Sequence, residues 1–168
     1  MPLFGDDGTT TPAELALDFV VIIDAARQAL HLPGSGPVTL VGVSRGADIA
    51  VVAAGQPRLQ AELNGVVVMG LTREEEYVRL GPLQPEALDL YAYLPQLGAV
   101  PLSVIQSTRD NYLSADAARV LFGEDTALRT FHAVDARDHS FGGARPLLYA
   151  ALRNSLAWVD RLGRRPAR

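Results

Sequence analysis

Apolar residues along the chain occur in two arrangements: short continuous runs, and longer segments with apolar positions at helical spacing. The short runs predict four buried strands, at residues 38–43, 65–70, 100–106 and 130–134. The segments with helical spacing predict helices at residues 12–30, 47–54, 115–122 and 146–162. Continuous apolar runs are typical of parallel strands, which are covered on both faces. The pattern therefore predicts an α/β fold with a parallel sheet of about four strands and helices on both faces.

Function is expected where the predicted strands end, because sites in parallel sheets gather at the carboxyl ends of the strands. These ends are expected just after four residues: Val43, Met69, Ser107 and Val134. Three of the four ends are followed by a residue that can carry catalytic chemistry: Ser44, Asp110 and His139. We therefore expect these three side chains to lie near one another at one edge of the sheet.

The segment Gly42-Val43-Ser44-Arg45-Gly46 joins a predicted strand to a predicted helix and has the pattern G-x-S-x-G. A serine at such a turn is expected to adopt a strained backbone conformation. The flanking glycines are expected to remove side chains that would collide with the neighbouring strand and helix. At the start of the helix, the helix dipole and the backbone N–H of Arg45 favour developing negative charge. We interpret Ser44 as a nucleophile; the alternative is an ordinary turn of small residues.

Asp110 and His139 are the candidate partners of the serine. Asp110 follows the third strand, where its carboxylate could orient an imidazole; the alternative is a turn-forming Asp-Asn pair. His139 lies in the loop after the fourth strand, whereas the other two histidines fall at a helix end and inside a strand. Asp135 and Asp138 are rival acids. Asp138 adjoins His139 in sequence, which makes a facing contact between their side chains awkward, so Asp110 is preferred.

Serine, aspartate and histidine follow one another along the chain in the order that α/β-hydrolases use. The mechanism that these residues predict is acyl transfer. His139 would take the proton of Ser44, and Ser44 would attack an ester-type carbonyl, while Asp110 holds the imidazole in the required tautomer. Water would then release the acyl group.

The chain resembles the α/β-hydrolase superfamily in GVSRG at 42–46, STRD at 107–110 and ARDHSFGG at 136–143. The resemblance covers nearly the whole chain. The segments STRDNYLSADAARVLFG and ARDHSFGG are also similar to the branch that includes bacterial virulence proteins of the VirJ type. The resemblance implies a serine hydrolase that acts on esters or related acyl bonds of small or lipid-like molecules, with no cofactor. It also implies specific roles for four residues: Ser44, Asp110 and His139 as the triad, and the backbone N–H of Arg45 as half of an oxyanion hole.

The chain departs from the superfamily because only the last four of its usual eight strands are recognisable. Strand Val38–Val43 would then form an apolar edge of the sheet, and such an edge invites pairing with another chain. The loop that supplies the second oxyanion donor in the family is also missing. The expectation is a partial α/β-hydrolase fold shortened at its N-terminus. The alternatives are a partner chain that completes the sheet, and a homodimer formed through this edge.

The length of 168 residues predicts one domain over residues 1–168, with a frayed tail at 163–168. Residues 71–99 are less regular and stand where the family often inserts lid or pocket elements. Within them, Glu74-Glu75-Glu76 predicts a helix start rather than a metal site. Aromatic and apolar residues could line an acyl pocket, although ordinary packing is favoured over that role: Met69, Tyr77, Leu80, Leu83, Tyr91, Tyr93, Leu94, Tyr112 and Phe141.

Composition excludes several other classes. A hydrophobic share of 48% rules out a disordered chain, and a net charge of −4 gives no basic excess for binding nucleic acid. The absence of cysteine excludes disulfides, thiolate metal sites and cysteine nucleophiles. No apolar run reaches the roughly 20 residues of a membrane helix, and no signal peptide is recognisable. The expected location is the cytoplasm by default, or the periplasm or exterior if an N-terminal signal has been lost.

Two functions remain open on the sequence alone. The first is a serine hydrolase, and the second is a non-catalytic or truncated half-domain that associates through its exposed elbow strand. A dinucleotide-binding domain is a distant third, because no G-x-G-x-x-G turn with an acidic residue about 20 positions later is present.

Overall fold

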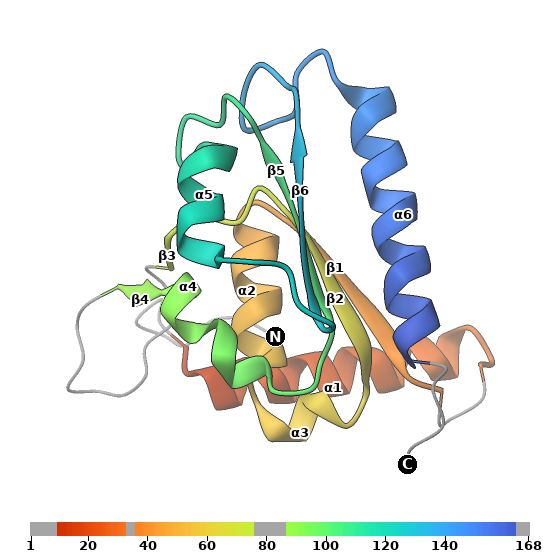
Figure 1. Ribbon diagram of the computed structural model, residues 1–168. Coiled ribbons are helices and arrows are strands. Elements are labelled where there is room, and N and C mark those ends of the chain that lie inside the picture. The colour runs from red at the N-terminus through yellow and green to blue at the C-terminus, as the bar shows by residue number, and fades with distance from the viewer. Residues whose placement is uncertain (1–9, 33–35, 76–86, 164–168) are drawn as a thin grey trace.

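A parallel four-stranded sheet forms the centre of the computed structural model, which describes residues 10–32, 36–75 and 87–163 (Figure 1). The strands are β1 (Val38–Val43), β2 (Leu63–Met69), β5 (Leu102–Ser107) and β6 (Arg129–Val134), in the order β1-β2-β5-β6. All three neighbouring pairs are parallel. The prediction of a parallel sheet of four strands is therefore confirmed.

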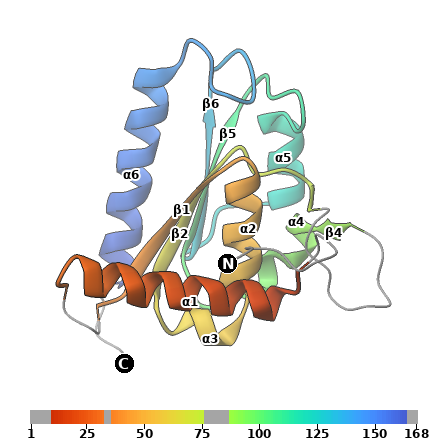
Figure 2. The same cartoon turned by 180° about the vertical axis from the view of Figure 1, so that it is seen from behind.

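Helices cover both faces of this sheet. Helices α2 (Arg45–Ala54) and α5 (Ala115–Phe122) pack on one face, and α6 (Arg145–Gly163) packs on the other (Figure 1). Helix α1 (Pro12–Ala29) lies across α2 and the short helix α3 (Pro57–Gln60), as the view from behind shows (Figure 2). The four long segments that the sequence assigned to helices agree with the structure, whereas the short helix α3 was not predicted.

Local sequence explains where these helices begin. The side chain of Thr11 accepts a hydrogen bond from the backbone of Glu14, and the Glu14 carboxylate accepts one from the backbone of Thr11, so α1 starts with a capping box. The Ser114 hydroxyl accepts a hydrogen bond from the backbone N–H of Ala117 and caps α5 in the same way. Gly123 ends α5 with a φ of 77°, a conformation that glycine adopts without steric cost.

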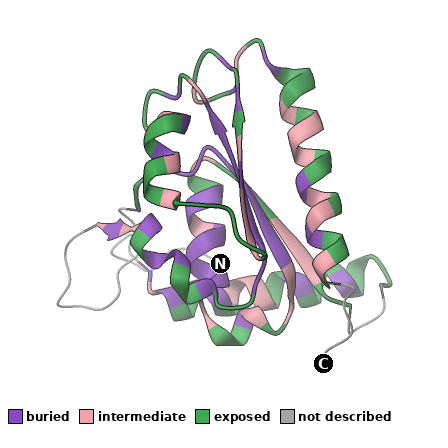
Figure 3. Cartoon of the chain, viewed as in Figure 1, coloured by how far each residue is buried: buried purple, intermediate pink, exposed green. Residues whose placement is uncertain are grey.

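The core is divided by the sheet into two parts. Along β2, Val66 and Val68 belong to the cluster on the side of α2 and α5, whereas Val67 and Met69 belong to the cluster on the side of α6. Because successive side chains of a strand point to opposite faces, a strand between two helical layers must be apolar at every position. This burial runs along the central strands in Figure 3.

Strand β1 forms one edge of the four-stranded sheet among the described residues, as the sequence predicted. Val41 and Val43 keep 50% and 55% of their surface exposed, although their sequence is that of an interior strand. Apolar residues on the outer surface of α1 are also exposed: Leu17, Val21 and Ile22. Strand β1 and helix α1 therefore each expose apolar side chains to solvent.

The segment after β2 differs from its prediction. Glu74 and Glu75 begin no helix; they form the short strand β3 (Glu74–Glu75), which pairs antiparallel with β4 (Leu88–Asp89). The backbone of Glu74 and Glu75 is paired with Asp89 and Leu88, which lie more than ten residues later and form no part of the local sequence pattern. Helix α4 (Leu90–Tyr93) and the 3₁₀ helix η1 (Leu94–Leu97) follow. Tyr77, Leu80, Leu83 and the tail after Gly163 lie outside the described residues.

Two searches across the described part of the chain gave negative results. No helix there is long and apolar enough to cross a bilayer. No group of three or more acidic, histidine or cysteine side chains is arranged to hold a metal ion within those same residues.

Candidate active site

Ser44 lies at the sharp turn between β1 and α2, with φ of 53° and ψ of −130°. This conformation is unfavourable for a residue with a side chain, and such strain is concentrated at functional sites. The turn is held by its backbone: the N–H of Ser44 donates to the carbonyl of Met69 at 2.8 Å, and the N–H of Ala47 donates to the carbonyl of Ser44 at 2.6 Å. The sequence prediction of a strained turn at this serine agrees with the structure.

The two glycines of the motif have different roles. A Cβ on Gly42 would lie 2.3 Å from the carbonyl oxygen of Gly46, so no larger residue fits at Gly42 without a backbone shift. A Cβ on Gly46 would meet no described atom within 4 Å. The expectation that both glycines avoid collisions is therefore correct for Gly42 and wrong for Gly46.

The three candidate catalytic side chains are hydrogen-bonded in series. Nε2 of His139 lies 2.7 Å from Oγ of Ser44, and Nδ1 of His139 lies 2.7 Å from Oδ2 of Asp110. The Asp110 side chain is completely buried, and that of His139 is 14% exposed. A carboxylate can only accept, so the ring proton belongs on Nδ1, and Nε2 is left to accept from the serine hydroxyl.

Asp110 is the carboxylate that contacts the imidazole, and the rival acids are used elsewhere. Oδ1 of Asp110 accepts hydrogen bonds from the backbone N–H groups of Tyr112 and Leu113 at 2.9 and 3.3 Å. Asp135 forms an ion pair with Arg109 at 3.0 Å on the surface. Asp138 accepts a hydrogen bond from the backbone N–H of Gly142, within its own loop.

Comparison with known proteins was made at the level of sequence and of structure. No protein-family model and no curated protein matches the chain. An esterase domain from Rhodothermus marinus matches with a TM-score of 0.55 and 19% identity, over 83% of this chain and 66% of that one. A cold-adapted esterase from an Arctic intertidal metagenomic library matches with a TM-score of 0.59 and 17% identity, over 92% and 59%.

A third solved structure decides the fold. The α/β-hydrolase enzyme MGS-M1, from a Medee basin deep-sea metagenome library, matches with a TM-score of 0.57 and 16% identity, over 90% of this chain and 64% of that one. The chain has a partial α/β-hydrolase fold. It spans 59–66% of the length of these three structures.

In this partial α/β-hydrolase fold, the loop that carries His139 is braced by its own backbone and by the sheet. Phe141 adopts a φ of 58°, which is strained for an aromatic residue, and its side chain is buried in the cluster beneath α6. Nε of Arg109 donates to the carbonyl of Ala136 at 3.1 Å, and the Ser107 hydroxyl donates to the same carbonyl. These contacts hold the loop against the end of β5, where Asp110 follows.

The proposed pocket residues do not form one group. Met69 and Phe141 lie in the core cluster on the side of α6, whereas Tyr91 lies in the cluster on the opposite side of the sheet. The ring of Tyr112 meets the His139 ring edge-on, with centroids 4.8 Å apart. Tyr112 is also 70% exposed, so it stands at the open side of the histidine.

Sequence analysis overlooked three residues around the relay. Gln106 donates from its side-chain amide to Oδ2 of Asp110 at 3.1 Å. Gly70 contacts the His139 ring so closely that a Cβ there would lie 2.8 Å from Cε1. Asp48, one turn after Ser44, is buried among apolar residues of α2. The sequence did contain a signal for Gln106 and Asp48, because each is a polar residue inside an otherwise apolar element.

The ionisation of Asp48 is unusual. Burial raises the pKa of its carboxyl from 3.8 to about 6, against the opposing effect of hydrogen bonds from Thr72. The nearby Glu75 raises this pKa further, and His139 lowers it. Burial also raises the pKa of the Tyr91 phenol, with a contribution from Asp48. The candidate site therefore has a second group of ionisable side chains beside the relay.

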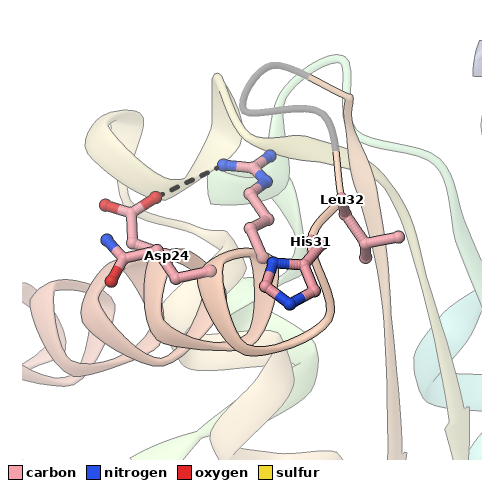
Figure 4. A pocket seen from close by; sticks show the side chains of 5 residues that line it. Asp24, His31 and Leu32 are labelled. Carbon is pink, nitrogen blue, oxygen red and sulfur yellow. Dashed lines mark hydrogen bonds and ion pairs between the residues drawn. The ribbon is translucent and has the colours of Figure 1, made fainter.

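A separate pocket of about 340 Å³ lies at the end of α1, among Asp24, Arg27 and His31 (Figure 4). Arg27 is buried there, and its guanidinium donates to Asp24, Glu62 and the carbonyl of Gly36. This arginine joins α1 to the loop before β1, at the opposite end of β1 from Ser44. We assign it a structural role.

Proposed function

We propose that the chain is a serine hydrolase that cleaves an ester or related acyl bond. The observation that carries this proposal is the unbroken series of contacts from Ser44 through His139 to Asp110, with both hydrogen-bond distances at 2.7 Å. A hydroxyl is a weak nucleophile unless a base accepts its proton, and this arrangement supplies the base. Two solved structures of similar fold are described as esterases, which is consistent with the same chemistry.

The steps follow from the positions of the atoms. Nε2 of His139 takes the hydroxyl proton as Oγ of Ser44 attacks the carbonyl carbon, and the carbonyl oxygen becomes negative. The backbone N–H of Arg45, at the start of α2, would stabilise that oxygen. His139 then returns the proton to the leaving alkoxide, and the acyl group stays on Ser44. Water, activated by the same imidazole, hydrolyses the acyl-enzyme. Asp110 stabilises the imidazolium throughout.

The substrate class that fits this proposal is a small or lipid-like acyl compound. The mechanism uses side chains and water, so it requires no cofactor. The exposed Tyr112 ring beside His139 offers an apolar surface for one side of such a substrate.

A fluorophosphonate probe tests the nucleophile directly. The folded chain should become labelled at Ser44, because the probe reacts with serines whose proton is accepted by a neighbouring base. Peptide mass spectrometry would locate the adduct, and Ser44→Ala should abolish it. Ser140, which lies exposed beside His139, provides a matched control, since Ser140→Ala should leave labelling unchanged. A folded, monodisperse preparation that stays unlabelled near neutral pH would contradict the proposal.

Association through β1 is a second candidate function, supported by the exposed Val41 and Val43 on an edge strand. The occupant that we propose is β1 of a second copy of this chain. Antiparallel pairing of two identical edge strands would satisfy the outward backbone groups of both and cover the apolar side chains.

Light scattering after size exclusion tests this association. We expect a dimer that Val41→Lys converts to a monomer, because a lysine on an edge strand opposes pairing. Val120→Lys is the matched control, since Val120 is 81% exposed on α5, away from β1. A wild-type chain that is monomeric at high concentration would exclude the homodimer, and a complex with a different chain that V41K disrupts would replace it with a partner protein.

A further inference from the structure

Asp48 is a buried carboxylate that the mechanism does not use. It lies on α2, one turn after Ser44, and its backbone N–H donates to the Ser44 carbonyl at 3.2 Å. Only 4% of its surface is exposed. A buried charge is costly unless hydrogen bonds compensate for it, so its presence in an apolar helix requires an explanation.

Both oxygens of Asp48 bind the segment that follows β2. Oδ1 accepts from the backbone N–H of Thr72 at 3.0 Å, and Oδ2 accepts from the Thr72 hydroxyl at 2.9 Å. The same segment is tied to the serine turn at its other end, where the Met69 carbonyl accepts from the N–H of Ser44 at 2.8 Å. The segment from Met69 to Thr72 is thus fastened to the start of α2 at two points.

Between these two points lies Gly70, whose backbone is in contact with the His139 ring. Gly70 adopts a φ of 65°, and a Cβ on it would lie 2.8 Å from Cε1 and 3.2 Å from Nδ1 of the imidazole. A shift of this segment would therefore change the position of the His139 ring relative to Ser44. Because Asp48 sets the position of the segment, it can act on His139 without touching it.

The ionisable groups around Asp48 belong to three other elements. Glu75 of β3 and Tyr91 of α4 are buried on its side of the sheet, and His139 comes from the loop after β6. The negative charge of Glu75 favours a proton on Asp48, while a charged imidazolium at His139 opposes it. Proton uptake by Asp48 is thus coupled to the charge of the catalytic histidine.

We propose that Asp48 is a positioning residue. As a carboxylate it holds the Met69–Thr72 segment in place beneath His139, and its protonation weakens this contact and lowers the rate of hydrolysis. This inference rests on the proposed function of the triad. A protonated Asp48 would donate to Oγ of Thr72 instead of accepting from it, and the Thr72 hydroxyl would turn to the carbonyl of Glu74, 3.0 Å away. A charge-assisted hydrogen bond is then replaced by a weaker neutral one. The acidic limb of the activity profile would then include the titration of Asp48.

The stability of the fold should favour the protonated form of Asp48, whereas activity favours the carboxylate. The pKa of Asp48 is raised in the folded chain from 3.8 to about 6, so the folded state binds this proton more tightly than the unfolded state. The proton on Asp48 therefore adds to the free energy of unfolding. Its contribution is complete below the pKa of the unfolded chain, 3.8, and is lost as the pH rises through about 6. A permanently neutral residue at this position should therefore make the fold more stable at neutral pH, while the carboxylate serves activity.

The test is Asp48→Asn, which keeps the size of the side chain and removes its charge. From about pH 5 to about pH 8, the titration of Asp48 should contribute to the fall of kcat/KM of the wild-type chain for an aryl ester on the acidic side. The D48N variant should show a less steep fall, because it lacks this titration. At neutral pH it should lose up to about 100-fold in kcat with little change in KM, since displacement of the imidazole affects the chemical step. Its melting temperature at neutral pH should rise.

Three further variants separate positioning from general damage. Thr72→Val removes the hydroxyl hydrogen bond to Asp48 and should give a loss of kcat between those of the wild type and D48N. Thr72→Ser keeps the hydroxyl and should retain the wild-type kcat. Asp116→Asn makes the same exchange in the first turn of α5. This variant should leave the pH dependence of kcat/KM and the melting temperature unchanged. A D48N profile parallel to that of the wild type would overturn the inference.

A readout that needs no turnover keeps the two proposals distinguishable. The NMR signal of the His139 ring should show an inflection from the titration of Asp48, and D48N should lack that inflection. An unlabelled, inactive wild-type chain with this inflection would reject the triad function alone. An active wild-type chain without it would reject the role of Asp48 alone.

Discussion

Replacement of His139 by alanine should lower kcat/KM for an activated aryl ester by about 10⁴- to 10⁶-fold, because the serine loses the base that takes its proton. Nε2 of His139 lies 2.7 Å from Oγ of Ser44, so the loss is direct. The residual rate would come from the oxyanion site and from substrate binding. Steady-state kinetics with purified variants would measure it.

Asp110→Asn should cost about 10⁴-fold, for a reason that the hydrogen bonds of this site make specific. Oδ1 accepts from the backbone N–H groups of Tyr112 and Leu113, so the amide oxygen will occupy that position. The amide NH₂ must then face Nδ1 of His139, in the place of Oδ2. Two donors cannot face each other, so the ring proton moves to Nε2, where it blocks proton transfer from Ser44.

Asp135→Asn is the matched control for Asp110→Asn. Asp135 is a rival acid by sequence, but its side chain is 75% exposed and pairs with Arg109. We expect D135N to keep the wild-type kcat/KM. Equal losses in D110N and D135N, or an H139A variant that retains wild-type rates, would contradict the assignment of the triad.

Gly42→Ala should prevent the serine turn from forming. The added Cβ would lie 2.3 Å from the carbonyl oxygen and 2.6 Å from the carbonyl carbon of Gly46, and 2.7 Å from Cα of Ala47. All three atoms belong to the backbone, so no side-chain rotation relieves the collision. Overpacking of this kind costs about 1–3 kcal/mol or more, and here it also displaces Ser44. Chemical denaturation and the rate of fluorophosphonate labelling should both show the defect.

Gly46→Ala makes the same chemical change four residues later and should be tolerated. No described atom lies within 4 Å of the new methyl group, and alanine is favoured over glycine inside a helix by up to about 1 kcal/mol. The G46A variant should therefore match or exceed the stability of the wild type and keep its labelling rate. A G42A chain that folds and reacts normally would show that the turn adapts, and would contradict the steric argument.

Much of the fold could be predicted because its determinants are local. The apolar runs at β2 and β5 had to be strands covered on both faces, and Thr11 and Ser114 capped the helices that follow them. Short segments of this kind encode their conformation in their own periodicity. The parallel order of the strands then brought Ser44, Asp110 and His139 to one edge of the sheet.

Contacts between distant segments could not be predicted in this way. Glu74 was expected to begin a helix, but it pairs with Asp89 of β4, and the segment extends as β3 instead. Met69 and Phe141 were candidates for a substrate pocket, yet each is packed in the core beneath α6. In both cases, the partner that decided the outcome lies far away along the chain.

The sequence by itself determined the α/β class, the order of the elements and the three residues most suited to acyl transfer, since periodicity, glycine spacing and residue chemistry are properties of short segments. Only the tertiary structure decided which carboxylate meets the imidazole, why Gly42 matters more than Gly46, and that Gln106, Gly70 and Asp48 surround the relay. The reason is physical: hydrogen-bond geometry, steric exclusion and burial arise when separate elements pack against one another, and no single segment contains them.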